Sequence, residues 1–391
     1  MSSNEVSWAL LAALAVTSPA CGGSGPHYPP PKYTDIGACA GAACDASADG
    51  PPDGAAACVP AIAGDAGASS GCLVVIASGR NDLVGFALDG ASVFWTERGG
   101  AGYDLKRAPA VGGPAHTVIT SAYRAVALGG GSAFFDSGNG IITMATDEVS
   151  ATAAFQGFGR KVAASASDVY EASCGGSFGS VLDLPTSGAA PTTLATVGCM
   201  NGLAFHGATV YGASIGGVEG DAGVVGAGVW AWPADGSPGA PLAGGVVATA
   251  DVADAGTSPD GAVDGGTPSG VYAPIGVTAD ATNVYWTDWG HGDVIPPDGA
   301  VMTMPLAGGP PVVLVAGLHG PGDLALDGDT LYWANTDGRI MKVSVAGGAP
   351  TVLATGQVDP LNVTVDATAV YWTNRGGVGA PQGAVLRLTP K

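Results

Sequence analysis

The feature that most constrains the fold of this chain is an internal repeat in which each copy carries one or two aromatic residues near its end. Each copy consists of an aliphatic strand, a short polar turn and an aromatic strand. Four copies match almost position for position, and they span residues 86–96, 277–287, 324–334 and 363–373. Weaker copies end at Phe134-Phe135, Val169-Tyr170 and Val210-Tyr211. Self-similarity at a period of roughly 40 residues indicates a repeat architecture.

The aromatic residue that marks each copy defines seven units, at Phe94, Phe134, Tyr170, Tyr211, Tyr285, Tyr332 and Tyr371. The clear units continue with a third strand, a Gly-Gly turn and a fourth strand, as in residues 302–315 and 341–354. Gly-Gly between two alternating strands indicates a hairpin, because both turn residues can take positive φ. The sequence therefore predicts an all-β protein: a seven-bladed β-propeller of four-stranded antiparallel blades.

The two ends of the repeat region complement each other. The last unit stops at its third strand, residues 385–388, while residues 74–79 before the first unit align with a fourth strand and its exit, residues 352–356. We therefore expect residues 73–79 to complete the last blade by pairing with residues 385–388. Closing the ring in this way removes the exposed edges that an open array would leave.

Composition agrees with this fold and excludes several functions. The chain has 391 residues with 66 Gly and 28 Pro, which makes a mostly helical protein improbable. Because 47% of the residues are hydrophobic, wholesale disorder is also excluded. The formal net charge of −20 argues against a nucleic-acid partner, since phosphates require a basic surface.

The aromatic strands also carry a recognisable four-residue pattern. Tyr285-Trp286-Thr287-Asp288 resembles the YWTD repeat of low-density-lipoprotein-receptor-type propellers, and related segments begin at Phe94, Tyr332 and Tyr371. The resemblance covers most of residues 80–391 as a repeat pattern. In that family the motif is structural, so the resemblance implies a structural role here. Such residues suit a sheet that is packed on both faces.

The N-terminal segment predicts export. Residues 1–20 contain a short apolar run followed by small residues, which is typical of an export signal, and Cys21 follows directly. The segment resembles a bacterial lipoprotein signal, which implies that Cys21 is lipidated and that the protein is anchored at the outer membrane or cell surface. Simple secretion is the alternative. We expect no other contact with the membrane, because no other segment is apolar enough to cross it.

Between the signal and the propeller lies a low-complexity stretch. Residues 21–72 are rich in Gly, Pro, Ala, Asp and Ser, and such a segment cannot bury enough apolar surface to offset its conformational entropy. We expect a flexible spacer there and the propeller over residues 73–391. A similar patch at residues 251–270 is interpreted as a loop insertion.

Seven cysteines fit an oxidising compartment, and lipidation of Cys21 would leave six for pairing. In the predicted strand order, Cys174 lies in a b–c loop and Cys199 in the following d–a loop. Both loops belong to the same rim in adjacent blades. We therefore predict a disulfide between Cys174 and Cys199. The pairing of the remaining cysteines stays open.

The length variation of the repeats predicts which rim carries function. With strands lettered a to d from the channel outwards, the a–b and c–d turns are short, and the insertions fall in the b–c and d–a loops. Function on repeated scaffolds concentrates in such loops. The candidate ligand-binding residues on this rim are Trp289, His291, Asp323 and Asn362. Each also has a structural reading: Trp289 as a cap on its blade, and the others as solvated or turn residues.

These observations leave two classes of function. The favoured class is an exported, non-catalytic binding scaffold, acting as a monomer on a protein, peptide or glycan ligand. The alternative is a calcium-dependent lyase or hydrolase at the channel mouth, because Asn201, Asp323 and Asn362 resemble the metal-holding ring of some propeller hydrolases and lactonases. No catalytic residue is assigned. Two Gly-x-Ser-x-Gly matches, at residues 175–179 and 212–216, lack the strand-to-helix elbow that a nucleophile requires.

Overall fold

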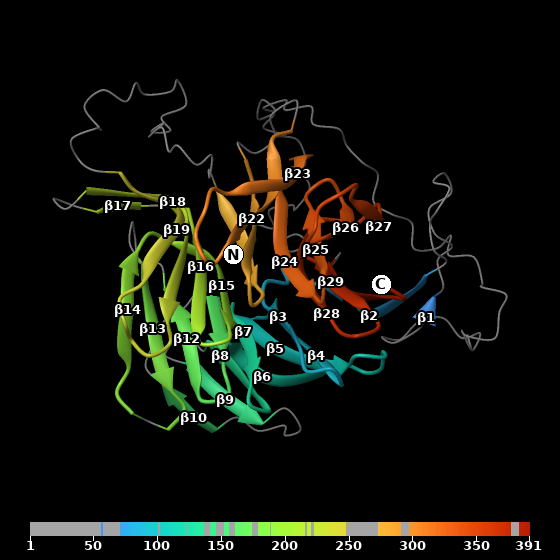
Figure 1. The fold of residues 1–391 in the computed structure, drawn as a ribbon. Coiled ribbons are helices and arrows are strands. Elements are labelled where there is room, and N and C mark those ends of the chain that lie inside the picture. The colour runs from blue at the N-terminus through green and yellow to red at the C-terminus, as the bar shows by residue number, and fades with distance from the viewer. Residues whose placement is uncertain are drawn as a thin grey trace, which may run out of the picture.

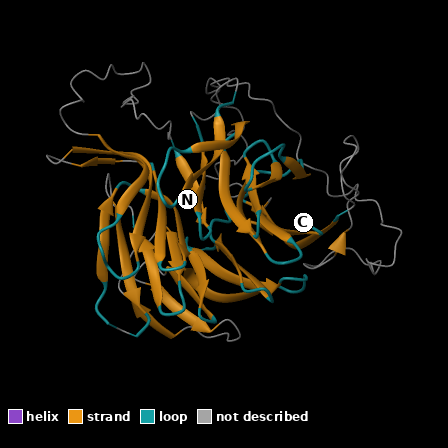
Figure 2. Cartoon of the chain, viewed as in Figure 1, coloured by secondary structure: helices purple, strands orange, loops and turns teal. Residues whose placement is uncertain are grey.

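The computed structural model describes most of the repeat region and one short strand before it. The described residues are 56–57, 71–100, 102–122, 124–136, 141–145, 152–155, 161–173, 179–187, 189–215, 217–219, 223–247, 273–290, 297–376 and 383–391. Within them, every regular element is a β-strand and no helix occurs (Figure 2). In particular, they contain no helix long and apolar enough to cross a membrane.

The strands form seven separate antiparallel sheets (Figure 1). Blade 1 contains β3 (Phe86–Leu88), β4 (Ser92–Arg98), β5 (Tyr103–Pro109) and β6 (His116–Ala122). Blade 2 contains β7 (Val126–Gly129), β8 (Ser132–Asp136), β9 (Ile141–Ala145) and β10 (Thr152–Phe155). Blade 3 contains β11 (Lys161–Ala164), β12 (Asp168–Ala172), β13 (Gly179–Pro185) and β14 (Thr192–Val197).

Blade 4 is longer than the others. It contains β15 (Met200–His206), β16 (Thr209–Ser214), β18 (Gly223–Pro233) and β19 (Ala240–Val247), with the short β17 (Gly217–Glu219) paired to β18. The end of β18 that pairs with β17 projects away from the ring (Figure 1). This projection belongs to the b–c connection, on the rim predicted to carry the insertions.

The last three blades are regular. Blade 5 contains β20 (Pro274–Ala279), β21 (Asn283–Asp288), β22 (Gly299–Pro305) and β23 (Val312–Leu318). Blade 6 contains β24 (Pro321–Asp327), β25 (Thr330–Asn335), β26 (Arg339–Ser344) and β27 (Thr351–Ala354). Blade 7 contains β28 (Pro360–Val365), β29 (Val370–Asn374), β30 (Gly383–Thr389) and β2 (Cys72–Arg80).

The seven sheets close into a ring. The first strand of each blade contacts the first strands of both neighbouring blades, and the circuit ends with β28 against β3. The first strands therefore surround the central channel, and the predicted seven-bladed propeller is confirmed. The predicted closure is also confirmed: β2 pairs antiparallel with β30, with Leu73 opposite Leu388 and Val75 opposite Leu386.

One short strand lies inside the segment predicted as a spacer. β1 (Ala56–Ala57) pairs with β2 as a fifth strand of blade 7. Residues 21–55 and 58–70, like the predicted insertion 251–270, lie outside the described residues.

The aromatic pairs build the core between blades. Neighbouring residues of a strand point to opposite faces of its sheet, so the two aromatics of one strand reach two different interfaces. Tyr285 packs with Trp333 of the next blade, and Tyr332 packs near Trp372 of the blade after that. Tyr371 and Trp95 close the series across the ring seam. The motif is therefore structural, as expected from the resemblance.

The third residue of the motif joins neighbouring blades. The Thr287 hydroxyl accepts a hydrogen bond from the Gly276 amide of its own blade at 2.9 Å and donates to the Gly322 carbonyl of the next blade at 2.6 Å. Thr96 makes the same pair of bonds to Gly85 and Arg124. Both threonines are fully buried. A backbone carbonyl of one blade is thus satisfied by a side chain of its neighbour.

The repeated Asp of the a–b turns has a structural role. The Asp89 carboxylate accepts hydrogen bonds from the Ala91 and Ser92 amides, and Asp280 does the same for Thr282 and Asn283. These side-chain bonds hold the tight turn in place. The a–b and c–d turns therefore form a uniform rim, which we call the tight rim. The opposite side, formed by the b–c and d–a connections, is called the loop rim.

Candidate functional site

Among the predicted ligand-binding residues, Trp289 follows β21 on the loop rim and is half-buried. Its amide donates to the Ala273 carbonyl at 2.9 Å. Its ring covers Gly320 in the connection between blades 5 and 6, because a Cβ at Gly320 would lie 3.0 Å from two ring atoms. Trp289 therefore packs across a blade junction, and the residue as a whole stays half-buried. His291, its predicted companion, lies outside the described residues.

Asp323 and Asn362 occupy equivalent positions on the first strands of blades 6 and 7. Each lies in the irregular step that follows the first residue of the strand. Asp323 is partly exposed, and its carboxylate accepts a hydrogen bond from the next amide, Leu324, at 3.0 Å. Asn362 is 5% exposed, and its side-chain amide donates to Thr373 at 3.0 Å. Its amide group is thus used within its own blade.

Asn201, the third candidate metal ligand, is out of register with these two. In blade 4, Gly202 takes the position that Asp323 and Asn362 hold in their blades. Within the part of the chain that the structure describes, no three or more His, Cys, Asp or Glu residues gather closely enough to hold a metal ion. The calcium site predicted as an alternative stays a prediction.

The position of Asp323 and Asn362 is filled mainly by small residues elsewhere in the ring. A Cβ at Gly85, Gly202 or Gly276 would lie 2.3 to 2.7 Å from backbone atoms of the next blade, so these positions require glycine. Lys161 lies at the corresponding position of blade 3. The loop-rim mouth of the channel therefore carries a few separated polar side chains among small residues.

A second group of residues on the loop rim was not predicted from the sequence. At the seam between blades 7 and 1, the Asp82 carboxylate accepts hydrogen bonds from the Arg375 Nε at 2.8 Å and from the Tyr103 hydroxyl at 2.6 Å. Asp82 is 2% exposed, whereas the Arg375 side chain is 40% exposed. The guanidinium group thus extends from a buried carboxylate to the surface.

Two aspartates of this region have an uncommon backbone conformation. Asp82 has φ 43° and Asp359 has φ 49°; Asp359 immediately precedes β28, and Asp82 lies in the segment that leads into β3. Gly320 holds the corresponding place in blade 6, with φ 46°. Asp is among the few non-glycine residues that tolerate this region. The sequence signal for this pattern is therefore an Asp or Gly just before the strand, as in Gly320-Pro321 and Asp359-Pro360.

The charges of this group depend on one another. Burial raises the pKa of Asp82, but hydrogen bonds from Tyr103 and Arg375 outweigh it and hold that pKa below its usual value. Burial and the bond to Asp82 raise the pKa of Tyr103. Desolvation of the carboxyl group by neighbouring atoms raises the pKa of Asp359, while the nearby charge of Arg375 opposes that increase.

Two further arginines lie against Tyr103. The Arg124 guanidinium lies 5.4 Å from the centre of the Tyr103 ring, within the range of a cation–π contact. Arg98 pairs with Tyr103 across β4 and β5, and its side chain interacts with the Tyr103 hydroxyl. We call Arg98, Arg124 and Arg375 the seam arginines.

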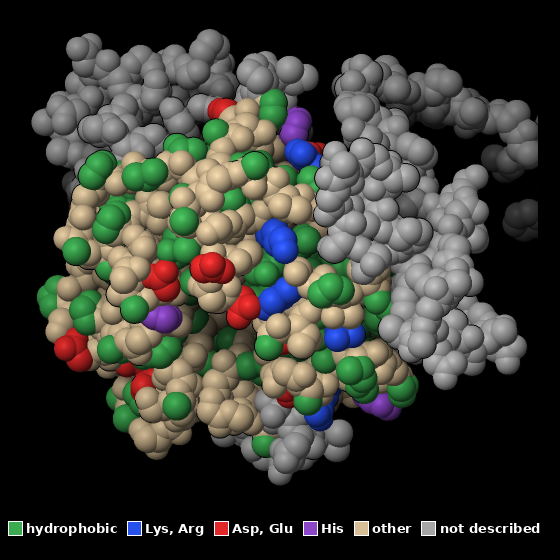
Figure 3. All heavy atoms as spheres, turned by 45° about the vertical axis from the view of Figure 1, so that its right-hand side comes forward, with side chains coloured by type: hydrophobic (Ala, Val, Ile, Leu, Met, Phe, Trp, Pro, Cys, Tyr) green, Lys and Arg blue, Asp and Glu red, His purple; other side chains and the backbone are tan. Residues whose placement is uncertain are grey.

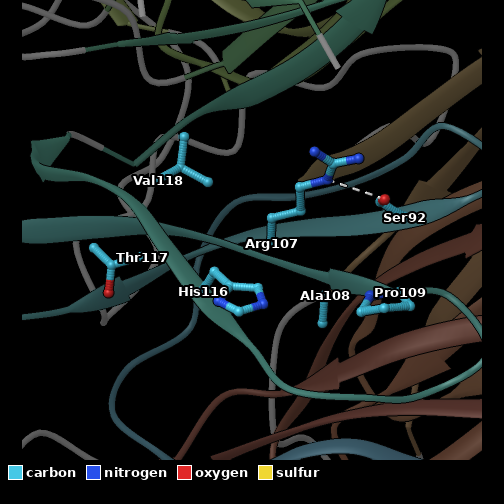
Figure 4. A pocket seen from close by; sticks show the side chains of 7 residues that line it. All are labelled: Ser92, Arg107, Ala108, Pro109, His116, Thr117 and Val118. Atoms are coloured by element: carbon cyan, nitrogen blue, oxygen red, sulfur yellow. Dashed lines mark hydrogen bonds between the residues drawn. The ribbon is translucent and has the colours of Figure 1, made fainter. Parts of the chain in front are cut away.

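A pocket of about 170 Å³ lies on the opposite side of blade 1 (Figure 4). Arg107 reaches across it to donate to the Ser92 hydroxyl at 3.0 Å, and its guanidinium lies 5.5 Å from the Phe94 ring centre. The pocket lies beside the tight rim. Its lining residues are Ser92, Arg107, Ala108, Pro109, His116, Thr117 and Val118.

The predicted cysteine chemistry is described only in part. Cys199 is 8% exposed and disulfide-bonded. Cys174 and Cys21 lie outside the described residues, so the Cys174–Cys199 pairing and the lipidation stay predictions. The Gly-x-Ser-x-Gly match at residues 212–216 places Ser214 at the end of β16, fully buried, and not at a strand-to-helix elbow.

Comparison with known proteins gives a similarity of fold. No protein-family profile matches the chain, and no curated protein sequence matches it. A solved oligogalacturonate lyase in complex with manganese is similar over 84% of this chain and 95% of its own, with a TM-score of 0.54 and 9% identity.

Two other solved structures give the same picture. An oligogalacturonate lyase from Vibrio parahaemolyticus reaches a TM-score of 0.52 at 9% identity over 82% of this chain and 94% of its own. A puromycin-hydrolyzing peptidase from Mycobacterium tuberculosis reaches 0.53 at 14% identity over 81% of this chain and 52% of its own. At these identities the likeness concerns the fold alone.

Proposed function

We propose that the chain is an exported, non-catalytic binding scaffold that holds a protein, peptide or glycan ligand on its loop rim. The observation that carries the proposal is the contrast between the two rims. Short turns, several of them held by an Asp carboxylate, form the tight rim, whereas the loop rim carries the projecting β17–β18 connection, the partly exposed Trp289 and the seam arginines. Ligand-binding residues concentrate on variable connections that a rigid scaffold positions.

The export part of the proposal rests on the sequence of residues 1–21. We propose that Cys21 is lipidated and anchors the monomeric propeller at the outer membrane or cell surface, with secretion as the outcome if it is not. Metabolic labelling with a radioactive fatty acid tests this. Labelling that survives Cys21→Ala contradicts the anchor.

The binding proposal is tested by screening the purified propeller on glycan and peptide arrays. For any ligand found, Trp289→Ala is expected to weaken binding by at least about 1 kcal/mol, because Trp contributes strongly when a partner buries it. The matched control is Val111→Ala on the tight rim, where the side chain is 73% exposed. Equal losses in both variants would contradict the assignment to the loop rim.

The alternative is a metal-dependent lyase or hydrolase that acts at the loop-rim mouth of the channel. The observation in its favour is the pair Asp323 and Asn362 at equivalent positions of adjacent blades. The similarity of fold to an oligogalacturonate lyase solved with manganese is compatible with this alternative. If calcium or manganese raises the melting temperature and Asp323→Ala abolishes that increase, the hypothesis of a metal-dependent enzyme replaces that of a binding scaffold.

A further inference from the structure

We propose that the seam arginines form a site for a ligand that presents a single carboxylate. This inference rests on the proposed binding function and names the ligand chemistry that one part of the loop rim accepts. Arg375, Arg124 and Arg98 surround the Asp82–Tyr103 pair.

The first step is that the bond to Asp82 uses only part of Arg375. Asp82 binds the Nε of Arg375, and among the described residues no hydrogen bond reaches its two Nη groups, although the charge of Asp359 lies nearby. A structural role, that of joining the segment before blade 1 to blade 7, accounts for the Nε bond. It does not account for the Nη donors, which lie on a side chain that is 40% exposed. The Nη pair is the part of the guanidinium that grips a carboxylate.

The second step is that the Arg124 guanidinium makes no hydrogen bond or ion pair to a carboxylate among the described residues, although its charge acts on the nearby Asp82. Its guanidinium contacts the face of Tyr103, whose own hydroxyl is fixed by Asp82. A planar guanidinium lying on an aromatic ring still presents its N–H edge. By contrast, Arg339 on the same rim is already occupied by Asp337 through both its Nε and an Nη.

The third step is the local charge. The seam arginines bring three positive charges, and Asp82 and Asp359 bring two negative ones, which leaves one positive charge. The neighbouring acids Glu97 and Asp104 are balanced by Arg80 and Lys106. In a chain with a net charge of −20 and only 13 Lys and Arg, a site with one excess positive charge suits one carboxylate better than a phosphate dianion. On the face shown in Figure 3, a few basic and a few acidic side chains lie within a surface of mostly uncharged side chains.

Benzoate is a suitable probe, with benzamide as its neutral counterpart and inorganic phosphate as the dianion. Binding to the purified propeller is followed by thermal shift and by calorimetry at constant ionic strength. We expect benzoate to raise the melting temperature, benzamide to have no effect, and phosphate to bind more weakly than benzoate. Arg375→Lys should weaken benzoate binding by about tenfold or more, because Lys lacks the fork of donors. Arg124→Lys should act in the same direction.

The control is Arg339→Lys, which changes an arginine of the same rim that Asp337 already occupies. Circular dichroism of each variant without ligand shows whether the propeller remains folded. Equal benzoate binding by wild type and Arg375→Lys overturns the proposal. So does the absence of a benzoate effect, or an equal effect of benzamide. Failure of the proposed binding function would be seen in a different experiment. Ligands found on the arrays would then bind the Trp289→Ala variant as tightly as the wild type.

Discussion

Blades 1, 5, 6 and 7 differ from blades 2, 3 and 4 at the centre of the second strand. The first group carries a fully buried Trp there: Trp95, Trp286, Trp333 and Trp372. The register of the sheets shows that the second group carries Phe135, Glu171 and Gly212 at the same position. Both groups nevertheless form four-stranded blades of one ring. The fold therefore requires that the space between blades be filled, and it does not require one particular residue.

Blade 4 shows how the space is filled without the motif. A Cβ at Gly212 would lie 2.7 Å from the ring of Trp232, so the indole of a third-strand residue occupies the volume that a second-strand Trp occupies elsewhere. Trp232 is 1% exposed and belongs to the cluster between blades 3 and 4. The aromatic mass is retained, and its point of attachment has moved to the neighbouring strand.

The largest expected effect concerns blade 7, whose outer strand comes from the other end of the chain. A chain trimmed to begin at Asp82 loses β2 and its buried residues Val74, Ile76 and Ala77, and it exposes the edge of β30. We expect aggregation or loss of cooperative unfolding, since an unpaired apolar edge invites intermolecular pairing. The control begins at Gly71 and keeps β2. A soluble Asp82 truncation with an unchanged melting curve would contradict ring closure by β2.

The next effect compares the two ways of filling the space between blades. Trp333→Ala and Trp232→Ala should each lower the free energy of unfolding by about 3–5 kcal/mol, because each removes a fully buried indole. Urea denaturation measures both. If Trp232→Ala cost less than about 1 kcal/mol, Trp232 would not replace the motif residue.

A smaller effect distinguishes the blades that contain the buried motif threonine. Thr287→Val keeps the volume but leaves the Gly276 amide and the Gly322 carbonyl without the hydroxyl that joins them. The expected loss is about 1–3 kcal/mol, the cost of buried groups without partners. Thr287→Ser is the control because it keeps the hydroxyl. Ala334 takes the equivalent position in blade 6, so Ala334→Val should lack this hydrogen-bond penalty.

The smallest expected effect concerns three buried tyrosines, and it is seen only at alkaline pH. Burial and hydrogen bonds to Asp280 and Asp366 raise the pKa of Tyr285 and Tyr371 to about 12. Since both values lie above the unfolded value of 10.0, the stabilisation is complete below pH 10 and is lost as pH rises through 12. Burial and the charges of Asp183 and Asp168 raise the pKa of Tyr170 of blade 3 to about 12 as well.

Stability measured from pH 9 to pH 12 tests this. Tyr371→Phe should flatten the fall in stability at the alkaline end, and Tyr170→Phe should do so without removing a bond to an a–b turn Asp. A fall in stability that is unchanged in Tyr371→Phe would show that this phenol does not contribute to it.

The fold was predictable because the repeat is local. Each aromatic marker, from Phe94 to Tyr371, stands opposite a small Ala or Thr of the first strand in its own blade, as in Ala87 and Thr364. Strand order and the Gly-Gly turns follow from patterns within about 40 residues, and the closing strand follows from the match of residues 74–79 to the fourth strand of another copy. The projecting β17 and the short β1 were not predicted, since neither carries the alternating pattern of the repeat.

The seam arginines were not predictable in the same way. Arg375 and Asp82 are separated by 293 residues in sequence, and only closure of the ring brings them together. Arg124 lies just before β7, and its contact with Tyr103 depends on how blades 1 and 2 meet. Trp289 was selected because it lies outside the strands, whereas its packing on Gly320 also depends on the ring.

The claim that the loop rim is the functional face is tested most directly by amide chemical-shift mapping during a benzoate titration of the propeller. We expect the perturbed amides to cluster at residues 81–85, 98–103, 359–362 and 375–376, and Arg375→Lys to remove the perturbation. Perturbed amides in the tight-rim turns at residues 89–91, 328–329 and 366–369, or around Arg107 and His116, would contradict it.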